Sequence, residues 1–374
     1  MENSLAPLAQ VRELFGSVER AGDSLAQFRW LVFRRHGKPL LLLPTNFRAA
    51  TAATQLYAAQ RPAARLVRKL LPWYAGTPLR TFGEQFTVQA DPIAPLTACL
   101  RELGGGDQSA CVTPAILIGN QPAAAQRFIL LALDGTRSPV AVVKAGLQPQ
   151  ARQIIAREAE VLRQLPADRL GIPKFRNHFA GETGSALAMD YYAGRSPTDD
   201  GEVGRILGSW LHEKETLTVG ATAVWQELAR VSATDPLFIS LNETLANRQV
   251  RAAVHHGDFT PWNVKVRPND AWVVVDWERG ALRGLPGWDW FHYEIQTAIL
   301  KHRLTAEAVA TRVEALFHQP QFKQYAQAAG IAAYLYPLTL AYLLYHNRVI
   351  KPGEGLQVGE QLLRWLAQRA ALPV

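Results

Sequence analysis

Short apolar segments separated by turn residues lie between residues 112 and 146, and this pattern constrains the fold more than any other feature. The segments are VTPAILIG, RFILLALD and PVAVVKAG. Each has the length and composition of a strand, and Asp134 and Gly135 mark a turn between the last two. Residues 149–165 then have helical periodicity, which must stop at Pro166. The pattern predicts a small antiparallel sheet with one helix.

The rest of the chain has a different pattern. Two more extended segments follow at residues 173–181 and 186–194, and after Gly194 the periodicity is mostly helical. Two segments interrupt the helical part, RAAVHHGDFTPWNVKVRP and AWVVVDWERG. Runs of strands followed by runs of helices are typical of an α+β protein. We therefore predict a small sheet followed by a larger helical part.

The residues before this pattern have their own expected elements. Residues 28–44 predict two strands joined by a turn at HGK, and Asn46 is expected to cap a helix through RAATAATQLYAA. A second helix is expected after Pro62, with a basic stripe and with its apolar residues turned away from that stripe. The stripe is Arg61, Arg65, Arg68 and Lys69, and the apolar residues are Leu66, Val67, Leu70 and Leu71. A short helix near 93–103 and a glycine linker at 104–106 complete this part.

The chain has 374 residues and a formal charge of +8, and this charge is concentrated near the N-terminus. Residues 1–80 contain twelve Lys and Arg against four Asp and Glu, which leaves the rest of the chain neutral. A uniformly basic nucleic-acid binder would look different, so no nucleic-acid partner is expected. The basic segment is a further domain docked on the small sheet-containing part, an extension of that N-terminal lobe with a solvated basic face, or a surface for an anionic partner, such as an acidic protein, a lipid headgroup or an anionic glycan.

Composition excludes several classes of protein. Hydrophobic residues make up 48 % and charged residues 19 %, which is typical of a globular chain and not of a disordered one. Cys99 and Cys111 cannot form a disulfide framework or a thiolate zinc site on their own. No signal peptide is visible. The uncharged residues 324–345 are expected to form a buried helix broken at Pro337, not a membrane span, and the protein is expected to be cytoplasmic.

The strongest functional signal is HGDFTPWN, followed by a hydrophobic run that ends in Asp276-Trp277-Glu278. Phosphoryl transfer needs a carboxylate that accepts or orients the hydroxyl proton, and oxygen ligands that hold magnesium against the nucleotide phosphates. Asp258 fits the first role. Asn263 and Asp276 fit the second, because Mg²⁺ prefers hard oxygen ligands and few protein groups. Glu278 is either a further metal ligand, a substrate contact or an ordinary exposed carboxylate.

These segments resemble the aminoglycoside phosphotransferase and choline kinase group, within the protein-kinase-like fold. The resemblance rests on HGDFTPWN, on VVVDWE and on the 18 residues from Asp258 to Asp276, and it covers roughly residues 112–350. It implies a bilobal α+β protein that uses ATP and Mg²⁺. The expected parts are a basic N-terminal α/β extension over residues 1–110, an antiparallel-sheet N-lobe over 111–193 and a helical C-lobe over 194–374.

The resemblance also implies roles for residues that bind the nucleotide. Lys144, on the third strand, is expected to contact the α- and β-phosphates, and Glu158, on the next helix, to pair with it. Glu160 lies about 200° around the helix from Glu158, so only one of the two can face the sheet. Gly119 and Asn120 either cover the phosphates through backbone N–H groups or form a plain hairpin turn.

Four further residues match positions of the same group. Adenine is expected to bond to the main chain of Asp190 and Tyr192, where the two lobes join. Met189 beside them either lines the adenine slot or fills the core. Asp289 is expected to brace the catalytic loop by accepting backbone hydrogen bonds, and His212 to be a buried group on a C-lobe helix.

Aromatic and acidic residues bear on the acceptor. The aromatic residues near the motifs are Trp262, Trp277, Trp288, Trp290 and Tyr293. Aromatic faces suit sugar rings and quaternary ammonium groups, although at least three of these five are expected to pack in the core. A polycationic aminoglycoside would need many carboxylates, and the C-lobe has one acidic cluster, at Asp199, Asp200 and Glu202.

The sequence therefore predicts a kinase that transfers the ATP γ-phosphoryl group to a hydroxyl of a small molecule. A sugar or small alcohol is the first expected acceptor, and choline, ethanolamine or an aminoglycoside is the alternative. A nucleotide-binding pseudokinase that acts as a scaffold is the alternative of another class, but all the main catalytic residues are present. Phosphorylation of protein side chains is a further alternative, which the short segment 277–290 disfavours.

Overall fold

The computed structural model divides the chain into two compact units. It describes residues 6–16, 26–56, 62–91, 94–103, 113–118, 125–165, 170–181, 184–350 and 357–372. The first unit comprises Met1–Arg163 and Lys174–Tyr191, and the second comprises Gln164–Pro173 and Tyr192–Val374. The N-terminal segment and the strands that follow it therefore belong to one unit, and the residues after Tyr191 belong to the other.

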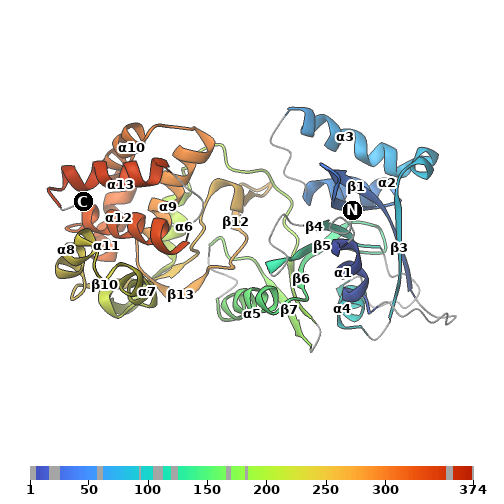
Figure 1. Ribbon diagram of the computed structural model, residues 1–374, viewed down its shortest axis with the longest axis horizontal. Coiled ribbons are helices and arrows are strands. Elements are labelled where there is room, and N and C mark those ends of the chain that lie inside the picture. The colour runs from blue at the N-terminus through green and yellow to red at the C-terminus, as the bar shows by residue number, and fades with distance from the viewer. Residues whose placement is uncertain are drawn as a thin grey trace. The chain divides into compact units, whose positions relative to one another are not determined.

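One antiparallel sheet of eight strands forms the centre of the first unit (Figure 1). Its strands are β1 (Ala26–Arg35), β2 (Lys38–Pro44), β3 (Gln85–Ala90), β4 (Ala115–Ile118), β5 (Phe128–Leu133), β6 (Pro139–Gly146), β7 (Phe175–Ala180) and β8 (Ser185–Asp190), in the spatial order β3-β1-β2-β4-β5-β6-β8-β7. Strand β2 pairs with β4 through Leu41 opposite Leu117 and Leu42 opposite Ile116. The expected small sheet is therefore part of a larger one that the N-terminal segment completes.

The first hairpin and the helix after it follow the sequence signals. His36 and Gly37, with φ of 51° and 76°, turn the chain between β1 and β2, and two residues of positive φ suit the twist of a tight hairpin. Asn46 then caps α2 (Phe47–Ala53), where its side-chain oxygen accepts hydrogen bonds from the backbone N–H groups of Arg48 and Ala49. The hairpin and the Asn46 cap are confirmed, but the α-helix ends at Ala53, before the end of the predicted segment RAATAATQLYAA.

Helices cover both faces of this sheet (Figure 1). The helices are α1 (Ala6–Leu14), α2, α3 (Pro62–Gly76), α4 (Pro95–Leu103) and α5 (Pro149–Gln164), with short 3₁₀ turns at Thr54–Leu56 and Pro78–Phe82. Apolar residues of α1 and α4 share one core with Trp30 and Val32 of β1, and residues of α2 and α3 share the other core with Leu31. Because neighbouring strand residues point to opposite faces, β1 contributes to both cores.

Helix α3 differs from the prediction in what it buries. The helix exists, but Leu66, Val67 and Leu70 are exposed, and Leu71 is the one member of the expected apolar set that is buried. The face packed on the sheet is formed by Leu71 and Ala75. The helical period predicted an amphipathic helix correctly, but it does not determine which of two apolar stripes meets the core.

The second unit is mostly helical. Its helices are α6 (Val203–Ser209), α7 (Ala223–Ser232), α8 (Pro236–Leu245), α9 (Trp288–Gln296), α10 (Ala306–His318), α11 (Pro320–Ala329), α12 (Leu335–Tyr345) and α13 (Gln357–Arg369), with 3₁₀ turns at Val219–Ala221 and Pro261–Asn263 and π-helical turns at Thr297–Lys301 and His346–Ile350. An antiparallel-sheet part followed by a helical part confirms the predicted α+β class.

Two small antiparallel sheets position the loops of the second unit. Strands β9 (Leu211–Thr218), β10 (Gln249–His255) and β13 (Ala281–Gly284) form one sheet, and β11 (Val264–Val266) pairs with β12 (Trp272–Val274) in the other. The prediction that His212 lies on a helix is wrong, because α6 ends at Ser209 and His212 lies on β9. There its imidazole Nε2 bonds to the carbonyl of Leu282, 2.8 Å away.

The uncharged residues 324–345 form parts of two helices, but the break is not at the predicted residue. Helix α11 ends at Gly330, whose φ of 75° is a left-handed conformation that glycine adopts easily. Pro337 lies in the first turn of α12, where a backbone N–H has no partner within the helix and proline is tolerated. Among the described residues, every helix falls short of the length and apolar character needed to cross a bilayer.

Candidate functional site

A buried ion pair joins the sheet of the first unit to α5. Nζ of Lys144 lies 2.7 and 2.8 Å from the two carboxylate oxygens of Glu158, and Glu158 has no exposed surface. Glu160 is exposed and pairs with Arg163 instead. The prediction that only one of the two glutamates faces the sheet is confirmed, and the pair gives β6 a fixed, buried cation.

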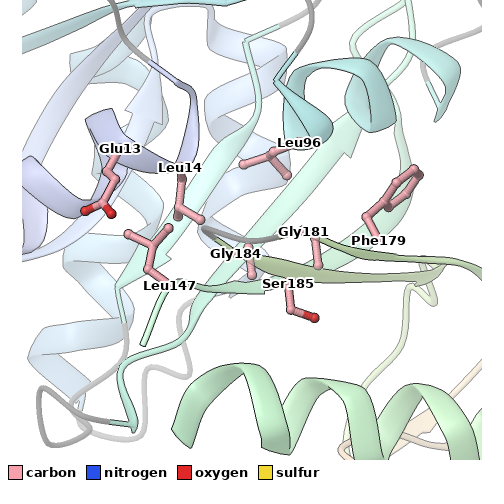
Figure 2. A pocket seen from close by; sticks show the side chains of 10 residues that line it. Glu13, Leu14, Leu96, Leu147, Phe179, Gly181, Gly184 and Ser185 are labelled. Carbon is pink, nitrogen blue, oxygen red and sulfur yellow. The ribbon is translucent and has the colours of Figure 1, made fainter. Parts of the chain in front are cut away.

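The two hollows described in the first unit lie away from this pair. Figure 2 shows the smaller one, about 40 Å³, beside Leu14, Leu96 and Ser185. Ala145 lines this hollow. Lys144 is its neighbour on β6, and neighbouring residues of a strand point to opposite faces of the sheet. The larger hollow, about 340 Å³, is lined by residues of α4 and β7 such as Cys99 and Arg176. Neither hollow contains Lys144 or Glu158.

The structure describes the two residues expected to contact adenine, but not the two expected to cover the phosphates. Gly119 and Asn120 lie outside the described residues. Asp190 ends β8, its carboxylate pairs with Arg176, and its backbone N–H donates to the carbonyl of Lys174 at 3.0 Å. Any role of Asp190 towards adenine would therefore fall to its carbonyl. Tyr192 is half-buried, and the guanidinium of Arg267 lies over its ring.

In the second unit, the HGDFTPWN segment forms a tight loop between β10 and β11. Gly257 has a φ of 77°, and a Cβ atom there would lie 2.7 Å from the Cβ of Arg279. Only glycine fits this combination of backbone conformation and close contact. The loop carries Asp258 and Asn263, and the backbone N–H of Val275, next to Asp276, donates to the carbonyl of Asn263 at 2.8 Å. The loop and the end of β12 are therefore joined directly.

Two side chains hold the Asp258 carboxylate. Nδ2 of Asn263 donates to Oδ2 at 2.9 Å, and Nε2 of His292, on α9, lies 2.9 Å from Oδ1. Burial by itself would raise the pKa of Asp258, but the hydrogen bond from His292 and the positive charge of Arg279 contribute to lowering it, and the pKa lies below its ordinary value. Asp258 is therefore an ionised carboxylate with a fixed orientation at neutral pH.

Asp289 holds the backbone of the loop through two hydrogen bonds. Its carboxylate oxygens accept the backbone N–H groups of His256 at 2.7 Å and Gly257 at 2.9 Å. Burial by itself would raise the pKa of Asp289, but the neighbouring His255, His256 and the backbone hydrogen bond lower it to about 2. These are the backbone bonds that the sequence predicted for Asp289.

His256 connects the loop to the strand that precedes Asp276. Its Nδ1 accepts the backbone N–H of Asp258 at 3.1 Å, and its Nε2 lies 3.1 Å from the carbonyl of Val275. An acceptor on one side and a donor on the other require the neutral imidazole with its proton on Nε2. Complete burial lowers the pKa of His256, against the opposing charges of Asp289, Asp258 and Asp276, which agrees with the neutral form.

The side chains of Asn263 and Asp276 offer the kinds of oxygen atom that a magnesium ion binds. Nδ2 of Asn263 bonds to Asp258, so its amide oxygen is the atom suited to a cation. Asp276 is half-buried and has a φ of 74°, a strained conformation for a residue with a side chain. An amide oxygen and a carboxylate are the hard ligands that Mg²⁺ takes, with water and phosphate oxygens completing its shell. Glu278 is half-buried, and its three predicted alternatives stay open.

Sequence reasoning missed the groups behind Asp258. The hydroxyl of Tyr342, on α12, lies 2.9 Å from Nδ1 of His292, so tyrosine, imidazole and carboxylate form a chain. Burial raises the pKa of Tyr342, which keeps its O–H as a donor. If Nε2 donates to Asp258, Nδ1 accepts from Tyr342. The only signal in the sequence was a histidine three residues after Asp289, which has no meaning without the fold.

Four of the five aromatic residues near the motifs are buried, as the core-packing prediction required. They are Trp277, Trp288, Trp290 and Tyr293. Trp262, between Asp258 and Asn263, is 38 % exposed and is the member that a ligand can reach.

The acidic residues predicted to cluster in the second unit form hydrogen bonds and ion pairs with residues near them. Asp200 accepts the hydroxyl of Tyr293 at 2.9 Å and pairs with Arg312. Asp199 accepts the backbone N–H of Gly201, and Glu202 pairs with Arg205 on the next turn. Contacts with neighbouring residues therefore engage each of these three carboxylates.

Comparisons with known proteins give weak likenesses. No family model matches, and no curated protein matches. A protein described as a fructosamine-3-kinase from Haemophilus somnus 129PT is 12 % identical, with 73 % of this chain and 96 % of that chain covered and a TM-score of 0.45. A thermostable mutant of the aminoglycoside phosphotransferase APH(4)-Ia, in complex with ADP and hygromycin B, is 13 % identical, with 69 % and 95 % covered and a TM-score of 0.46. Similarity at this level carries no argument about function.

Proposed function

We propose that the protein is an ATP- and Mg²⁺-dependent kinase that transfers the γ-phosphoryl group to a hydroxyl of a small molecule. The observation that carries the proposal is the Asp258 carboxylate, which Asn263 and His292 orient on a loop braced by Asp289. The buried Lys144–Glu158 pair of the first unit supports it, because a fixed cation on a strand is what the phosphates of a nucleotide require.

Asp258 serves as the orienting carboxylate and proton acceptor. The hydroxyl oxygen of the acceptor attacks the γ-phosphorus, the bond from that phosphorus to the bridging oxygen of ADP breaks, and the hydroxyl proton passes to Asp258. The lowered pKa of Asp258 makes it a weak base. It therefore orients the hydroxyl and takes the proton late in the transfer.

Asn263 and Asp276 would hold magnesium, and Lys144 would contact the nucleotide phosphates. Magnesium, when bound, supplies positive charge against the phosphate oxygens. Glu158 positions Lys144 by fixing its ammonium group. The carbonyl of Asp190 and the main chain of Tyr192 are the proposed adenine contacts.

The acceptor is proposed to be a neutral sugar or small alcohol. The acidic residues that a polycationic aminoglycoside would need are engaged in Asp200–Arg312 and Glu202–Arg205 contacts. Trp262 offers an exposed aromatic face four residues from Asp258, which suits a sugar ring by stacking and choline by cation–π attraction. Choline is therefore the second choice.

An acceptor screen with ADP detection tests this function. Sugars, amino alcohols and aminoglycosides are offered with MgATP, and a sugar or small alcohol is expected to stimulate ADP release. Asp258→Asn should lower kcat for that acceptor by about 100- to 10,000-fold and leave nucleotide affinity unchanged. Asp270→Asn, at an exposed turn between β11 and β12, is the matched control and should keep full activity. Nucleotide binding without acceptor-dependent ADP release would favour the scaffold, and full activity of Asp258→Asn would exclude the assigned carboxylate.

A further inference from the structure

Helix α3 exposes apolar side chains in a row. Leu66 is 59 % exposed, Leu70 57 % and Trp73 64 %. Spaced by four and then three residues, they occupy about 60° of the helix circumference. The opposite face, at Leu71 and Ala75, is packed on the sheet. A helix on the surface of a soluble domain normally turns a polar face outwards, so the outer row of α3 needs an explanation.

Further exposed apolar side chains lie on the elements before and after α3 in the chain. The ring of Phe47, at the start of α2, lies 5.1 Å from that of Trp73 and is itself 43 % exposed. Gly76 allows this close approach, because a Cβ atom there would come within 2.8 Å of Phe47. After α3, the 3₁₀ turn Pro78–Phe82 adds Leu79 and Phe82, which is 87 % exposed. We call Phe47, Leu66, Leu70, Trp73, Leu79 and Phe82 the apolar row.

The segment that carries the apolar row has formal charge of one sign. Residues 24–83 contain ten Lys and Arg and no Asp or Glu. Arg48 follows Phe47 in the sequence and Lys69 precedes Leu70, and both basic side chains are exposed. Arg80 lies between Leu79 and Phe82 in the sequence. Glu84, the next acidic residue, forms a two-bond pair with Arg34. The segment therefore combines exposed apolar side chains with exposed basic ones, and Arg48 also attracts the carboxylate of Asp134 from outside the segment.

We propose that this face docks on an anionic lipid bilayer, with the apolar row at the level of the headgroups. Leucine, tryptophan and phenylalanine beside lysine and arginine are the composition by which amphipathic surfaces lie in a membrane interface. A folded protein partner would require polar groups to pair with on this face. Between Leu66 and Trp73 the outer side of α3 offers Lys69 alone for that purpose. A bilayer needs only apolar contact and positive charge.

Sedimentation with vesicles tests the proposal on the full chain. The probes are vesicles of phosphatidylcholine alone and of phosphatidylcholine with phosphatidylglycerol. Binding is expected to be at least about tenfold tighter to the anionic vesicles and to weaken when salt is raised, because each basic residue near the surface adds attraction that salt screens. Brominated lipids should quench tryptophan fluorescence on binding, and Trp73→Phe should remove most of that quenching.

Two double variants separate the apolar and the electrostatic contributions. Leu70→Gln with Trp73→Gln, and Arg48→Gln with Lys69→Gln, should each weaken binding about tenfold or more. The matched control removes two exposed apolar residues of the second unit, Val231→Gln with Ile239→Gln, which are 44 % and 46 % exposed. This control should bind as the unaltered chain does. Circular dichroism and nucleotide binding show that each variant is folded.

Three results would overturn the proposal. One is the absence of binding to anionic vesicles. Another is binding that the Leu70 and Trp73 changes leave intact while a soluble polyanion competes fully, since this means a dissolved anionic partner. The third is a concentration-dependent dimer that these same changes dissolve, since this means that a second copy covers the row. None of these results bears on phosphoryl transfer, so the proposal and the proposed function fail separately.

Discussion

At the scale of single residues, the Asp258 carboxylate depends on groups far from it in the chain. The oxygens are fixed by Asn263 and His292, and His292 is in turn fixed by Tyr342 of α12. This arrangement makes His292 a positioning residue in our proposal, because it acts through Asp258. Its effect should therefore appear in the pH profile as well as in the rate.

Replacing His292 should slow transfer and shift its pH dependence. His292→Gln is expected to lower kcat by about 10- to 100-fold, since a small displacement of Asp258 is costly, with little change in the nucleotide KM. Loss of the His292 hydrogen bond also removes a cause of the lowered pKa of Asp258. The acid limb of the pH–rate profile should then move to higher pH.

Two further variants complete this test. Tyr342→Phe should give a smaller shift of the acid limb in the same direction, because it removes only the support behind the imidazole. His302→Gln, at an exposed position, is the control and should keep the original profile. An acid limb unmoved in His292→Gln would show that the imidazole has no influence on Asp258.

His256 predicts a second pH effect, on stability. Burial lowers the pKa of His256 in the folded protein below the value of about 6.5 expected when it is unfolded. Its stabilising contribution is thus complete above about pH 6.5 and is lost as pH falls through the folded pKa. The melting temperature should fall between about pH 7.5 and 5.5, and less steeply in His256→Asn than in the unaltered chain. His318→Asn, at an exposed site, should keep the original slope, and equal slopes for all three would contradict the prediction.

At the scale of elements, the main finding is that β1 and β2 complete the sheet that carries Lys144. The pairing of β2 with β4 covers an edge of β4, and Leu41 and Leu43 share a core with Leu131. The sequence left open whether this segment is a separate module or an extension of the N-terminal lobe, and these contacts make β1 and β2 part of the sheet.

Removing the N-terminal elements should therefore unfold the first unit. A chain lacking residues 1–80 loses β1, β2 and α3, which exposes the β4 edge and one side of the core. We expect an insoluble product, or a soluble one without the nucleotide binding of the full chain. Solubility assays and nucleotide titration distinguish these from the opposite result, a soluble fragment with unchanged affinity, which would show that the sheet is stable without β1 and β2.

At the scale of the whole molecule, the sequence predicted local structure well and long-range contacts poorly. Strands β4 to β8 and the Asn46 cap follow from period and turn chemistry within a few residues, and the helical period also predicted that only one of Glu158 and Glu160 faces the sheet. The HGDFTPWN loop was recognisable because its residue types and their spacing resemble those of a known group of proteins. His292, Tyr342 and β9 were missed, since their positions depend on contacts between segments that no local pattern encodes.

The position of the basic segment in the fold gives a new interpretation of the charge near the N-terminus. This charge belongs to a segment whose strands lie inside the first unit and whose helix α3 lies on its surface. Several of its basic side chains, among them Arg48 and Lys69, are exposed, so the charge does not conflict with the packing of the strands. The strands supply stability, and the outer face of α3 is available for the proposed docking.

The pairing of β2 with β4 has a consequence for how the chain is made. Leu41 and Leu117 meet in the sheet, although a long stretch of chain separates them. During synthesis the β1–β2 hairpin emerges early and has to wait for β4 with one edge unpaired. Such a delay slows folding and leaves an apolar edge open to aggregation. Newly made chains should therefore depend on chaperones until β4 has left the ribosome.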